Sequence, residues 1–434
     1  MDLAAFHLLS ATEAARLIRD GILSSEQLVD ACLARIREID PQVEAWAFLD
    51  PDHALAQARA DDTLRLSGQP IGALHGVPVA IKDIFDTADM PTECGSPIYA
   101  GRTPSRDATV VVKLRAAGAV IIGKTVTTEF AYFSPGKTRN PHDTERTPGG
   151  SSSGSAAAVA AGMVPLAVGS QTNGSLIRPG SFCGVYAMKP TWNAVSAEGV
   201  KLISTTLDTV GWYGRSVADL ALLADAFALQ DDDPSSFQTV AGARILIDAT
   251  AYKADAASRD ALAQAAQRLE AAGAVAVRRD LAEIFTPLDG IWEIVSRSEG
   301  RTAFLNLARL YSHLLHEEFM RRANNVGGFT RSDLVHAYDT AATYRVRFDR
   351  IAGDFDAVLT LSAPGEAPEG RVQGDNSLNR DLTLLHVPCI NIPAGLGPNR
   401  MPVGLTLTGP RYRDRHLLTV AAGIAPAIDC DRVP

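Results

Sequence analysis

The sequence predicts an α/β protein that folds as one large domain around a sheet of buried strands. Short apolar segments, typical of such strands, alternate with helical segments along most of the 434 residues. Neither an internal repeat nor a long polar linker divides the chain. Because 46% of the residues are apolar, a chain of this length can bury a large core.

The first 65 residues are expected to form helices. Ser10 and Glu13 form a capping box that begins one helix, and Ser24 or Ser25 begins a second. Pro41 is expected to end that second helix, because proline lacks the amide hydrogen that an interior position donates.

Residues 70–235 form the expected core of the sheet. A helix is predicted from Asp107 to Ala117, closed by Gly118. Strands are predicted from short apolar runs within GVPVAIKDIFD (76–86), AVIIGKT (119–125), GMVPLAVGSQTNGS (162–175) and GVYAMKPT (184–191).

The C-terminal half continues the alternation around a helical insertion. A helix from Asp255 to Ala272 precedes a predicted strand at 274–280. Residues 280–350 are expected to form a mostly helical insertion on the substrate side, interrupted by a loop at 324–329. The chain then returns to the sheet over residues 354–434, with strand signals at 356–365, 389–395 and 403–409.

The charge and cysteine patterns argue against several functions. With 41 basic against 50 acidic residues the net charge is −9, and no long basic run offers a surface for nucleic acid. The five cysteines and nine histidines show no metal-ligand spacing, which argues against a zinc site or a disulfide framework. The N-terminal residues lack the features of a secretory signal, and no apolar run is long enough to cross a bilayer. We therefore expect a cytoplasmic protein without a metal, a membrane or a nucleic-acid partner.

Residues 118–125 match the P-loop spacing GxxxxGK[ST] of a nucleotide-binding site. A P-loop follows a strand and opens a helix, whereas here a helix precedes Gly118 and residues 119–122 belong to a predicted strand. We interpret the match as a helix end followed by a strand, with a P-loop nucleotide-binding protein as the alternative.

The segment GGSSSGSAAAVAAG (149–162) is either a flexible linker or a functional site. A linker is polar on both flanks, but this segment passes into an alanine-rich helix and a strand. Small residues at a loop-to-helix junction allow close backbone approach and leave free N–H groups at the helix start. Residues 150–154 also match the GxSxG nucleophile elbow, but a polar loop precedes them where an elbow needs a hydrophobic strand. The pattern therefore favours a site of another kind.

Three segments together resemble the amidase signature family of hydrolases: 76–87, 107–125 and, most specifically, 149–191. Weaker likeness in LTLSAPG, HVPCINIPAG and PVGLTLTG extends the resemblance over most of the chain. It implies one large domain with a central mixed β-sheet flanked by helices. It also implies an amidase that hydrolyses a small-molecule amide to a carboxylate and ammonia through a serine acyl-enzyme, without a metal or organic cofactor.

By position in the motifs, the resemblance places the nucleophile on Ser175, the bridging serine on Ser151 and the lysine on Lys82. It also implies a cis peptide between Gly150 and Ser151. The lysine amine would accept the proton that the bridging serine relays from the nucleophile, so it must be neutral. Burial at the end of an apolar strand can lower its pKa, provided that the neighbouring Asp83 points elsewhere.

The backbone N–H groups of Thr172, Asn173 and Gly174 are the expected oxyanion hole, which stabilises the tetrahedral intermediate. Alternatively, these residues form an ordinary Asn-Gly turn. We also assign Ser152 to substrate binding. The alternative for Ser152 and its two neighbours is an N-cap cluster for the helix that follows.

The sequence departs from the commonest family pattern at three positions. Gln171 stands at a frequent Asp position and Asn173 where most members have Gly, so Asn173 either narrows the site or adopts a positive φ. The usual arginine position holds Ile177, and Arg178 follows it. This form resembles the malonamidase-like branch, in which the shifted arginine receives a substrate carboxylate. Arg178 is therefore either a bidentate carboxylate ligand or part of a structural salt bridge.

Two alternatives within the family stay open. The chain could be the glutaminase subunit of a tRNA-dependent amidotransferase, or an inactive binding relative. Relatives are often dimers, which implies a homodimer here. The sequence does not identify the amide, whose acyl pocket we expect to be formed by residues 125–140 and the 280–350 insertion.

Overall fold

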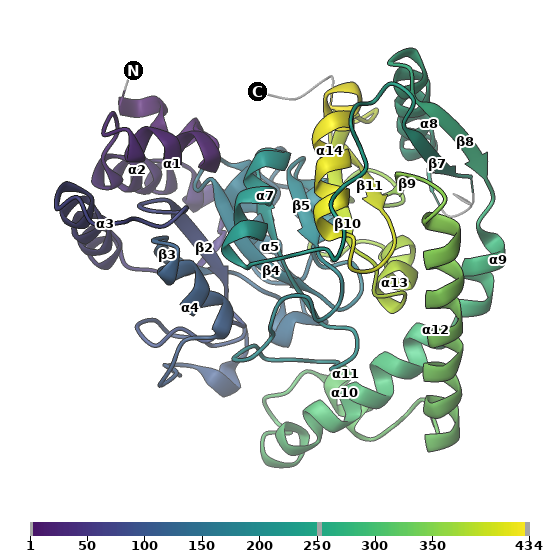
Figure 1. The fold of residues 1–434 in the computed structure, drawn as a ribbon. Helices are drawn as coiled ribbons and strands as arrows, with labels where there is room; N and C mark the ends of the chain where they lie inside the picture. The colour runs from purple at the N-terminus through teal and green to yellow at the C-terminus, as the bar shows by residue number, and fades with distance from the viewer. Residues whose placement is uncertain (1–2, 250–253, 430–434) are drawn as a thin grey trace.

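One sheet of eleven strands runs through the computed structural model, which describes residues 3–249 and 254–429 (Figure 1). The strand order is β1-β3-β2-β4-β6-β5-β10-β11-β9-β7-β8. The strands are β1 (Trp46–Leu49), β2 (Pro78–Lys82), β3 (Val120–Thr125), β4 (Leu166–Gln171), β5 (Tyr186–Lys189), β6 (Thr209–Gly214), β7 (Arg244–Asp248), β8 (Val275–Arg279), β9 (Ala357–Leu361), β10 (Cys389–Leu396) and β11 (Pro402–Thr408). Because β2 is parallel to β3 and β4, and β7 to β8 and β9, while the other pairs are antiparallel, the predicted mixed sheet is confirmed.

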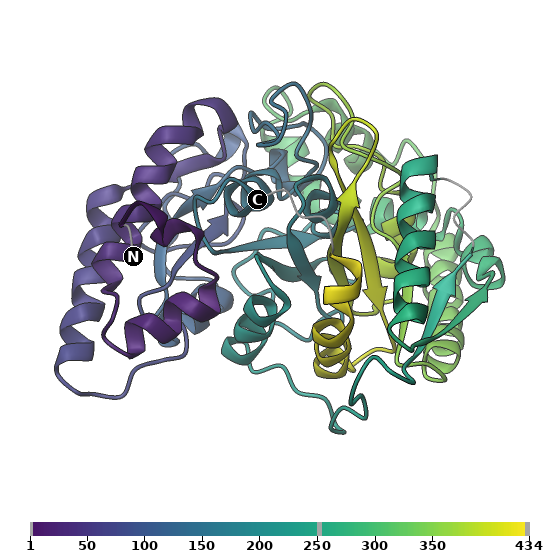
Figure 2. The same cartoon turned by 90° about the horizontal axis from the view of Figure 1, so that it is seen from above.

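Helices cover the sheet and extend beyond its two ends (Figures 1 and 2). The α-helices are α1 (Ala11–Arg19), α2 (Ser25–Val43), α3 (Pro51–Leu66), α4 (Thr109–Ala116), α5 (Ser153–Ala160), α6 (Ile177–Phe182), α7 (Val217–Ala226), α8 (Ala256–Ala271), α9 (Ala282–Phe285), α10 (Ile291–Leu310), α11 (Glu317–Ala323), α12 (Arg331–Ala352), α13 (Ser377–Leu384) and α14 (Asp414–Ile428). Short 3-10 helices lie at η1 (Leu3–Leu8), η2 (Pro97–Tyr99), η3 (Glu129–Ala131) and η4 (Thr286–Leu288). The N-terminal helices lie at the β1 end of the sheet. Of the insertion helices, α9 and α12 lie at the opposite end, whereas α10 and α11 extend below the sheet toward its middle (Figure 1).

The core consists of apolar layers on the two faces of the sheet. Alternate residues of β2 show this arrangement, because successive side chains of a strand point to opposite faces. Val79 and Ile81 pack in the layer that contains α4, α7, α8 and α14, whereas Ala80 packs in the layer with α2, α3 and α5. A third apolar cluster lies under the insertion helices α9, α10 and α12.

The N-terminal helices begin as the sequence predicts, but the second one ends later. Ser10 accepts from the N–H of Glu13 at 3.1 Å and caps α1, and Ser24 caps α2. Pro41 does not end α2, which continues to Val43. The helix can pass the proline because it ends within the same turn, where Glu44 in left-handed conformation donates its N–H to the carbonyl of residue 40.

Each predicted strand segment contains an observed strand, but three further strands are not predicted. β1 lies within the segment expected to be helical and pairs with β3, and β6 and β7 lie inside the sheet. The predicted loop at 324–329 separates α11 from α12.

The P-loop alternative for residues 118–125 is wrong. Gly118 follows the end of α4 with φ 85°, and Val120–Thr125 forms the buried strand β3 rather than opening a helix. Lys124, which would bind phosphate in a P-loop, is completely buried in that strand.

Cys32, Cys94, Cys183 and Cys389 are buried and form no disulfide, and Cys430 lies outside the described residues. Among helices of the described ranges, we find none with the length and apolar character needed to span a bilayer. Nor do the described His, Cys, Asp and Glu side chains include a group of three that could hold a metal ion.

Candidate active site

The three residues assigned to catalysis lie at one edge of the sheet. Lys82 is the last residue of β2, and Ser175 lies in the loop that follows β4. Since β2 and β4 are parallel neighbours, their carboxyl ends meet at the same edge. Ser151 approaches this edge from the loop before α5.

Lys82 contacts two hydroxyl groups. Its Nζ donates to Ser151 Oγ at 2.7 Å and to Ser170 Oγ at 2.9 Å. The side chains of Lys82 and Ser151 are completely inaccessible to solvent. Ser170 lies within the segment 149–191, but no role follows from its position in the sequence, because only the pairing of β2 with β4 brings it to the lysine.

Burial lowers the pKa of Lys82 to about 7, while Asp208 and Cys94 act in the opposite direction. A large fraction of the amine is therefore neutral near pH 7 and able to accept a proton. This is the property that the proposed general base requires.

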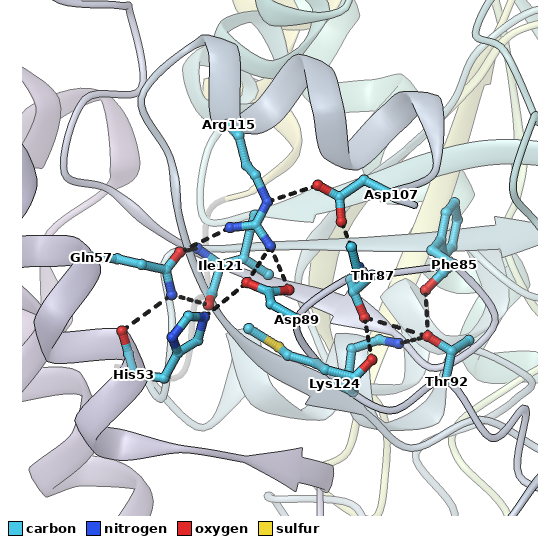
Figure 3. A network of polar contacts seen from close by, with 12 residues as sticks. His53, Gln57, Phe85, Thr87, Asp89, Thr92, Asp107, Arg115, Ile121 and Lys124 are labelled. Atoms are coloured by element: carbon cyan, nitrogen blue, oxygen red, sulfur yellow. Dashed lines mark hydrogen bonds and ion pairs between the residues drawn. The ribbon is translucent and has the colours of Figure 1, made fainter. Parts of the chain in front are cut away.

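The carboxylate next to Lys82 in the chain is held by another lysine. Asp83 lies 3.2 Å from Lys124 Nζ. That Nζ also donates to Thr92 Oγ1 at 2.6 Å (Figure 3). Burial raises the pKa of Asp83, and the ammonium of Lys124 opposes that effect. The strand register pairs Ile81 with Lys124, so Lys124 lies on the sheet face opposite to that of Lys82.

The peptide bond between Gly150 and Ser151 is cis, as the resemblance implied. Gly149 before it has φ 79°, a conformation that favours glycine. Arg178 Nη2 donates to the carbonyl of Gly150 at 2.5 Å, and Nη1 donates to that of Gly374 at 2.8 Å. The guanidinium thus links the cis peptide to the loop before α13.

Arg178 is completely buried, and burial lowers its pKa to about 10. Its Nε has no hydrogen-bond partner, and none of the ion pairs in the described ranges includes it. The structural salt bridge suggested as one role is therefore absent there, since backbone carbonyls occupy the guanidinium instead. A substrate carboxylate could accept from the remaining N–H donors, including Nε, but would have to reach a completely buried guanidinium.

The side chain of Gln171 holds the end of the loop that carries Ser175. Its Oε1 accepts from the N–H groups of Leu176 and Ile177 at 2.9 and 3.1 Å, at the start of α6. Gln171 thus supplies the acceptor that Asp would supply at this position. Ser175 is 4% exposed, and its carbonyl accepts from the hydroxyl of Tyr213 at 3.2 Å.

The hydroxyls of Ser151 and Ser175 share no hydrogen bond in the part of the chain that the structure describes. Proton transfer between them therefore requires a closer approach, and catalytic hydrogen bonds commonly tighten only when substrate binds.

The carbonyls of the expected oxyanion loop point to the scaffold. Trp292 Nε1 donates to the carbonyl of Thr172 at 3.1 Å, and Thr383 Oγ1 donates to that of Asn173 at 2.8 Å. The C=O and N–H of one trans peptide point in opposite directions. The N–H groups of Asn173 and Gly174 therefore point away from Trp292 and Thr383. The N–H of Gly174 donates to Oδ1 of Asn173.

One of the two alternatives for Asn173 is excluded. Asn173 does not adopt a positive φ, so it does not replace glycine for that reason. Gly174 also has no positive φ, but an added Cβ would lie 2.6 Å from Oδ1 of Asn379, so close approach requires the glycine.

The structure gives no support to a contact between Ser152 and substrate. Ser152 is completely buried, and its Oγ donates to the carbonyl of Ser170 at 3.1 Å and accepts from the N–H of Ser170 at 3.3 Å. Ser152 occupies the N-cap position of α5, but its side chain makes no capping hydrogen bond. Its hydroxyl therefore fixes the strand that carries Ser170.

The two regions expected to form the acyl pocket pack against each other beside the site. Phe130, in the loop whose Thr128 N–H donates to the carbonyl of Ser151, contacts Phe304 of α10 and Phe319 of α11. That these regions also line the pocket stays a prediction.

Comparison with known proteins adds the family. The model of the family described as Amidase matches residues 27–418. A glutamyl-tRNA(Gln) amidotransferase subunit of Chloroflexus aggregans is 32% identical, with 95% of each chain covered. The corresponding protein of Acidothermus cellulolyticus is 34% identical, with 96% of this chain and 94% of the relative covered.

Solved structures agree in fold. The native peptide amidase of Stenotrophomonas maltophilia superposes with a TM-score of 0.85 at 29% identity, covering 98% of each chain. The same glutamyl-tRNA(Gln) amidotransferase subunit from Thermotoga maritima gives 0.79 at 28% identity, covering 96% of this chain and 94% of that one. These relatives do not confirm the malonamidase-like branch, because they are amidotransferase subunits and an amidase of another kind.

Proposed function

The chain belongs to the amidase family and is a hydrolase of amide C–N bonds, and from that premise we propose that it hydrolyses a small-molecule carboxamide to carboxylate and ammonia. One observation carries the proposal: a buried lysine, whose pKa burial lowers to about 7, lies 2.7 Å from the hydroxyl of Ser151. A neutral amine in contact with a relaying hydroxyl can activate a serine nucleophile.

In this proposal Ser175 Oγ attacks the amide carbon, its proton passes to Ser151, and the Ser151 proton passes to Lys82. The proton returns along the same path to the leaving nitrogen, which departs as ammonia and leaves an ester on Ser175. Water then attacks the ester with the same groups, and the serine leaves with its proton restored. The chain's own residues balance every proton transfer.

The negative oxygen of each tetrahedral intermediate would accept from the N–H groups of Asn173 and Gly174. Removing one such donor typically costs about 3 to 4 kcal/mol of transition-state stabilisation. The Gly174 donor would exchange the side-chain oxygen of Asn173 for the substrate oxygen.

The test is ammonia release from a panel of primary amides by the wild-type chain and by Ser175→Ala. The proposal requires turnover by the wild type and its loss in the variant. Full activity in Ser175→Ala would overturn the proposed nucleophile. Absence of turnover with every amide would favour an inactive binding relative.

A second candidate function is that of an amidotransferase component, with glutamine as the source of ammonia. The observation that favours it is the identity of 32 to 34% to glutamyl-tRNA(Gln) amidotransferase subunits over 95% or more of this chain. Ammonia release by the chain purified without partner subunits would support the small-molecule amidase. Release from glutamine only after a partner protein is added would support the amidotransferase role.

A substrate that bears a carboxylate is a finer proposal, which depends on Arg178. The chain offers this cation three residues after Ser175, and its Nε has no hydrogen-bond partner, but an anion must reach a completely buried guanidinium. The test compares kcat/KM for malonamate and acetamide in the wild type and in Arg178→Ala. An equal ratio in both proteins, with thermal unfolding showing that the variant is folded, would exclude a carboxylate ligand.

A further inference from the structure

A carboxylate lies behind the nucleophile loop, just before β6. Asp208 Oδ1 accepts from Thr172 Oγ1 at 2.6 Å, and Oδ2 accepts from the N–H groups of Ile203 and Ser204 at 2.6 and 3.2 Å. All three donors are fixed by the fold, so the carboxylate joins the turn at 203–208 to the loop that carries the expected oxyanion donors.

Thr172 is consequently held on two sides. Its hydroxyl donates to Asp208, and its carbonyl accepts from Trp292 of α10 at 3.1 Å. These contacts fix the peptide between Thr172 and Asn173, whose N–H is one of the donors proposed for the oxyanion. The loop therefore depends on a residue that is 36 positions away in the chain.

The same carboxylate lines a small cavity together with Ser170, whose hydroxyl accepts from Lys82 Nζ at 2.9 Å, so it lies close to the lysine. Its negative charge favours the protonated amine and opposes the effect of burial on the pKa of Lys82, as does Cys94. Asp83, although adjacent in the chain, is paired with Lys124 instead. Burial and the charge of Glu299 raise the pKa of Asp208, to about 6, while the three hydrogen bonds oppose this shift. The ammonium of Lys201 also lies within range of Asp208.

We propose that Asp208 is a positioning residue of the amidase reaction, which fixes the oxyanion loop through Thr172 and presents a negative charge to the Lys82 amine. The proposal rests on the proposed function, because both groups on which Asp208 acts belong to that site. It gives one side chain two separable effects: a hydrogen bond that sets the geometry of the loop, and a charge that sets the pH at which the amine becomes neutral.

The charge is tested by Asp208→Asn, with Asp414→Asn as the matched control. Asp414 is likewise a carboxylate that accepts from a threonine, Thr191, through both N–H and hydroxyl at 2.7 Å; it is buried, but its charge does not act on Lys82. Two rates are measured at a series of pH values: the rate of amide hydrolysis, and the rate at which a fluorophosphonate labels Ser175. The acid limb is the part of each pH–rate profile in which the rate falls as Lys82 becomes protonated. We expect the limb to move to lower pH in Asp208→Asn and to stay in place in Asp414→Asn.

The hydrogen bond is tested by Thr172→Val, which keeps the shape of the side chain and the charge of Asp208. We expect kcat to fall about tenfold, the typical effect of losing a hydrogen bond to a charged group, with the acid limb unmoved. A limb that stays in place in Asp208→Asn, or a wild-type kcat in Thr172→Val, would overturn the proposal. Should Asp208→Asn fail to fold, Thr172→Val still decides it.

The labelling rate separates this proposal from the proposed function. If Ser175 is labelled with the expected pH dependence but no amide is hydrolysed, the amidase proposal fails while the effect of Asp208 on Lys82 stands. If amides are hydrolysed and the limb does not respond to Asp208→Asn, the amidase proposal stands and this one fails.

Discussion

Two buried lysines lie on neighbouring strands, Lys82 at the end of β2 and Lys124 on β3, and their surroundings differ. Both are completely buried. Lys124 lies 3.2 Å from the carboxylate of Asp83, whereas Lys82 donates to the hydroxyls of Ser151 and Ser170. The two side chains lie on opposite faces of the sheet.

The difference bears on why Lys82, and not Lys124, is the lysine proposed as the general base. Burial lowers the pKa of both, but at Lys124 the paired carboxylate of Asp83 opposes that effect. At Lys82 hydroxyl groups replace the counter-ion, so the pKa reaches about 7 and the neutral amine is populated. The pairing of Asp83 with Lys124 is also what keeps that carboxylate from stabilising the charged form of Lys82.

The largest expected effect is on catalysis. Lys82→Met should lower kcat by about 10²- to 10⁴-fold, because the proposed base is removed. The measurement is ammonia release, with thermal unfolding as the control for folding. Turnover at the wild-type rate in a folded Lys82→Met protein would remove Lys82 from the mechanism.

The next effect is on the pH dependence of stability. The pKa of Lys82 is lowered from 10.5 to about 7 on folding, so between these values the unfolded chain binds more protons and stability rises with pH. Below the pKa that Lys82 has in the folded protein, the wild type bears the full free-energy cost of a charged lysine in the interior, about 4 to 5 kcal/mol. Lys82→Met lacks it, so the stability of the variant relative to wild type should be greatest at acid pH and decline as the pH rises. Urea unfolding at a series of pH values measures this, and a difference independent of pH would contradict the lowered pKa.

Lys124→Met should cost about 3 to 5 kcal/mol of unfolding free energy, because it leaves the buried carboxylate of Asp83 unpaired. The double variant Lys124→Met/Asp83→Asn should recover part of the loss. Urea unfolding of the three proteins measures the coupling. Equal stability of Lys124→Met and wild type would show that the pair is not structural.

Ser170→Ala should lower kcat by about 10- to 100-fold, because it removes one of the two hydroxyls that hold the Lys82 amine. Steady-state kinetics with the preferred amide gives the value. A wild-type kcat would mean that Ser151 alone positions the lysine.

The smallest effect is expected at Ser152. Ser152→Ala should lower kcat by less than about tenfold, because its hydroxyl bonds to the backbone of Ser170 and acts on Lys82 indirectly. An increase in KM with unchanged kcat would instead indicate the direct substrate contact expected from the sequence.

Local sequence was enough to predict much of the fold. The capping residues Ser10 and Ser24 begin their helices because a cap depends on the next three residues. The apolar runs at β2, β3 and β4 predicted buried strands, because a short run of apolar residues is itself a local pattern. The short strands β1 and β6 were missed, because they carry no long apolar run and depend on pairing with distant neighbours.

The sequence by itself also singled out Lys82 in the segment 76–87 and Ser151 and Ser175 in the segment 149–191, because the ordered spacing of these segments resembles the family. Only the tertiary structure decided how burial lowers the pKa of Lys82, which carbonyls Arg178 binds, that Ser170 contacts Lys82, and that Asp208 holds Thr172. The reason is physical: a motif records residue types along the chain. A pKa or a hydrogen bond, by contrast, depends on burial and on groups that only the folded sheet brings together.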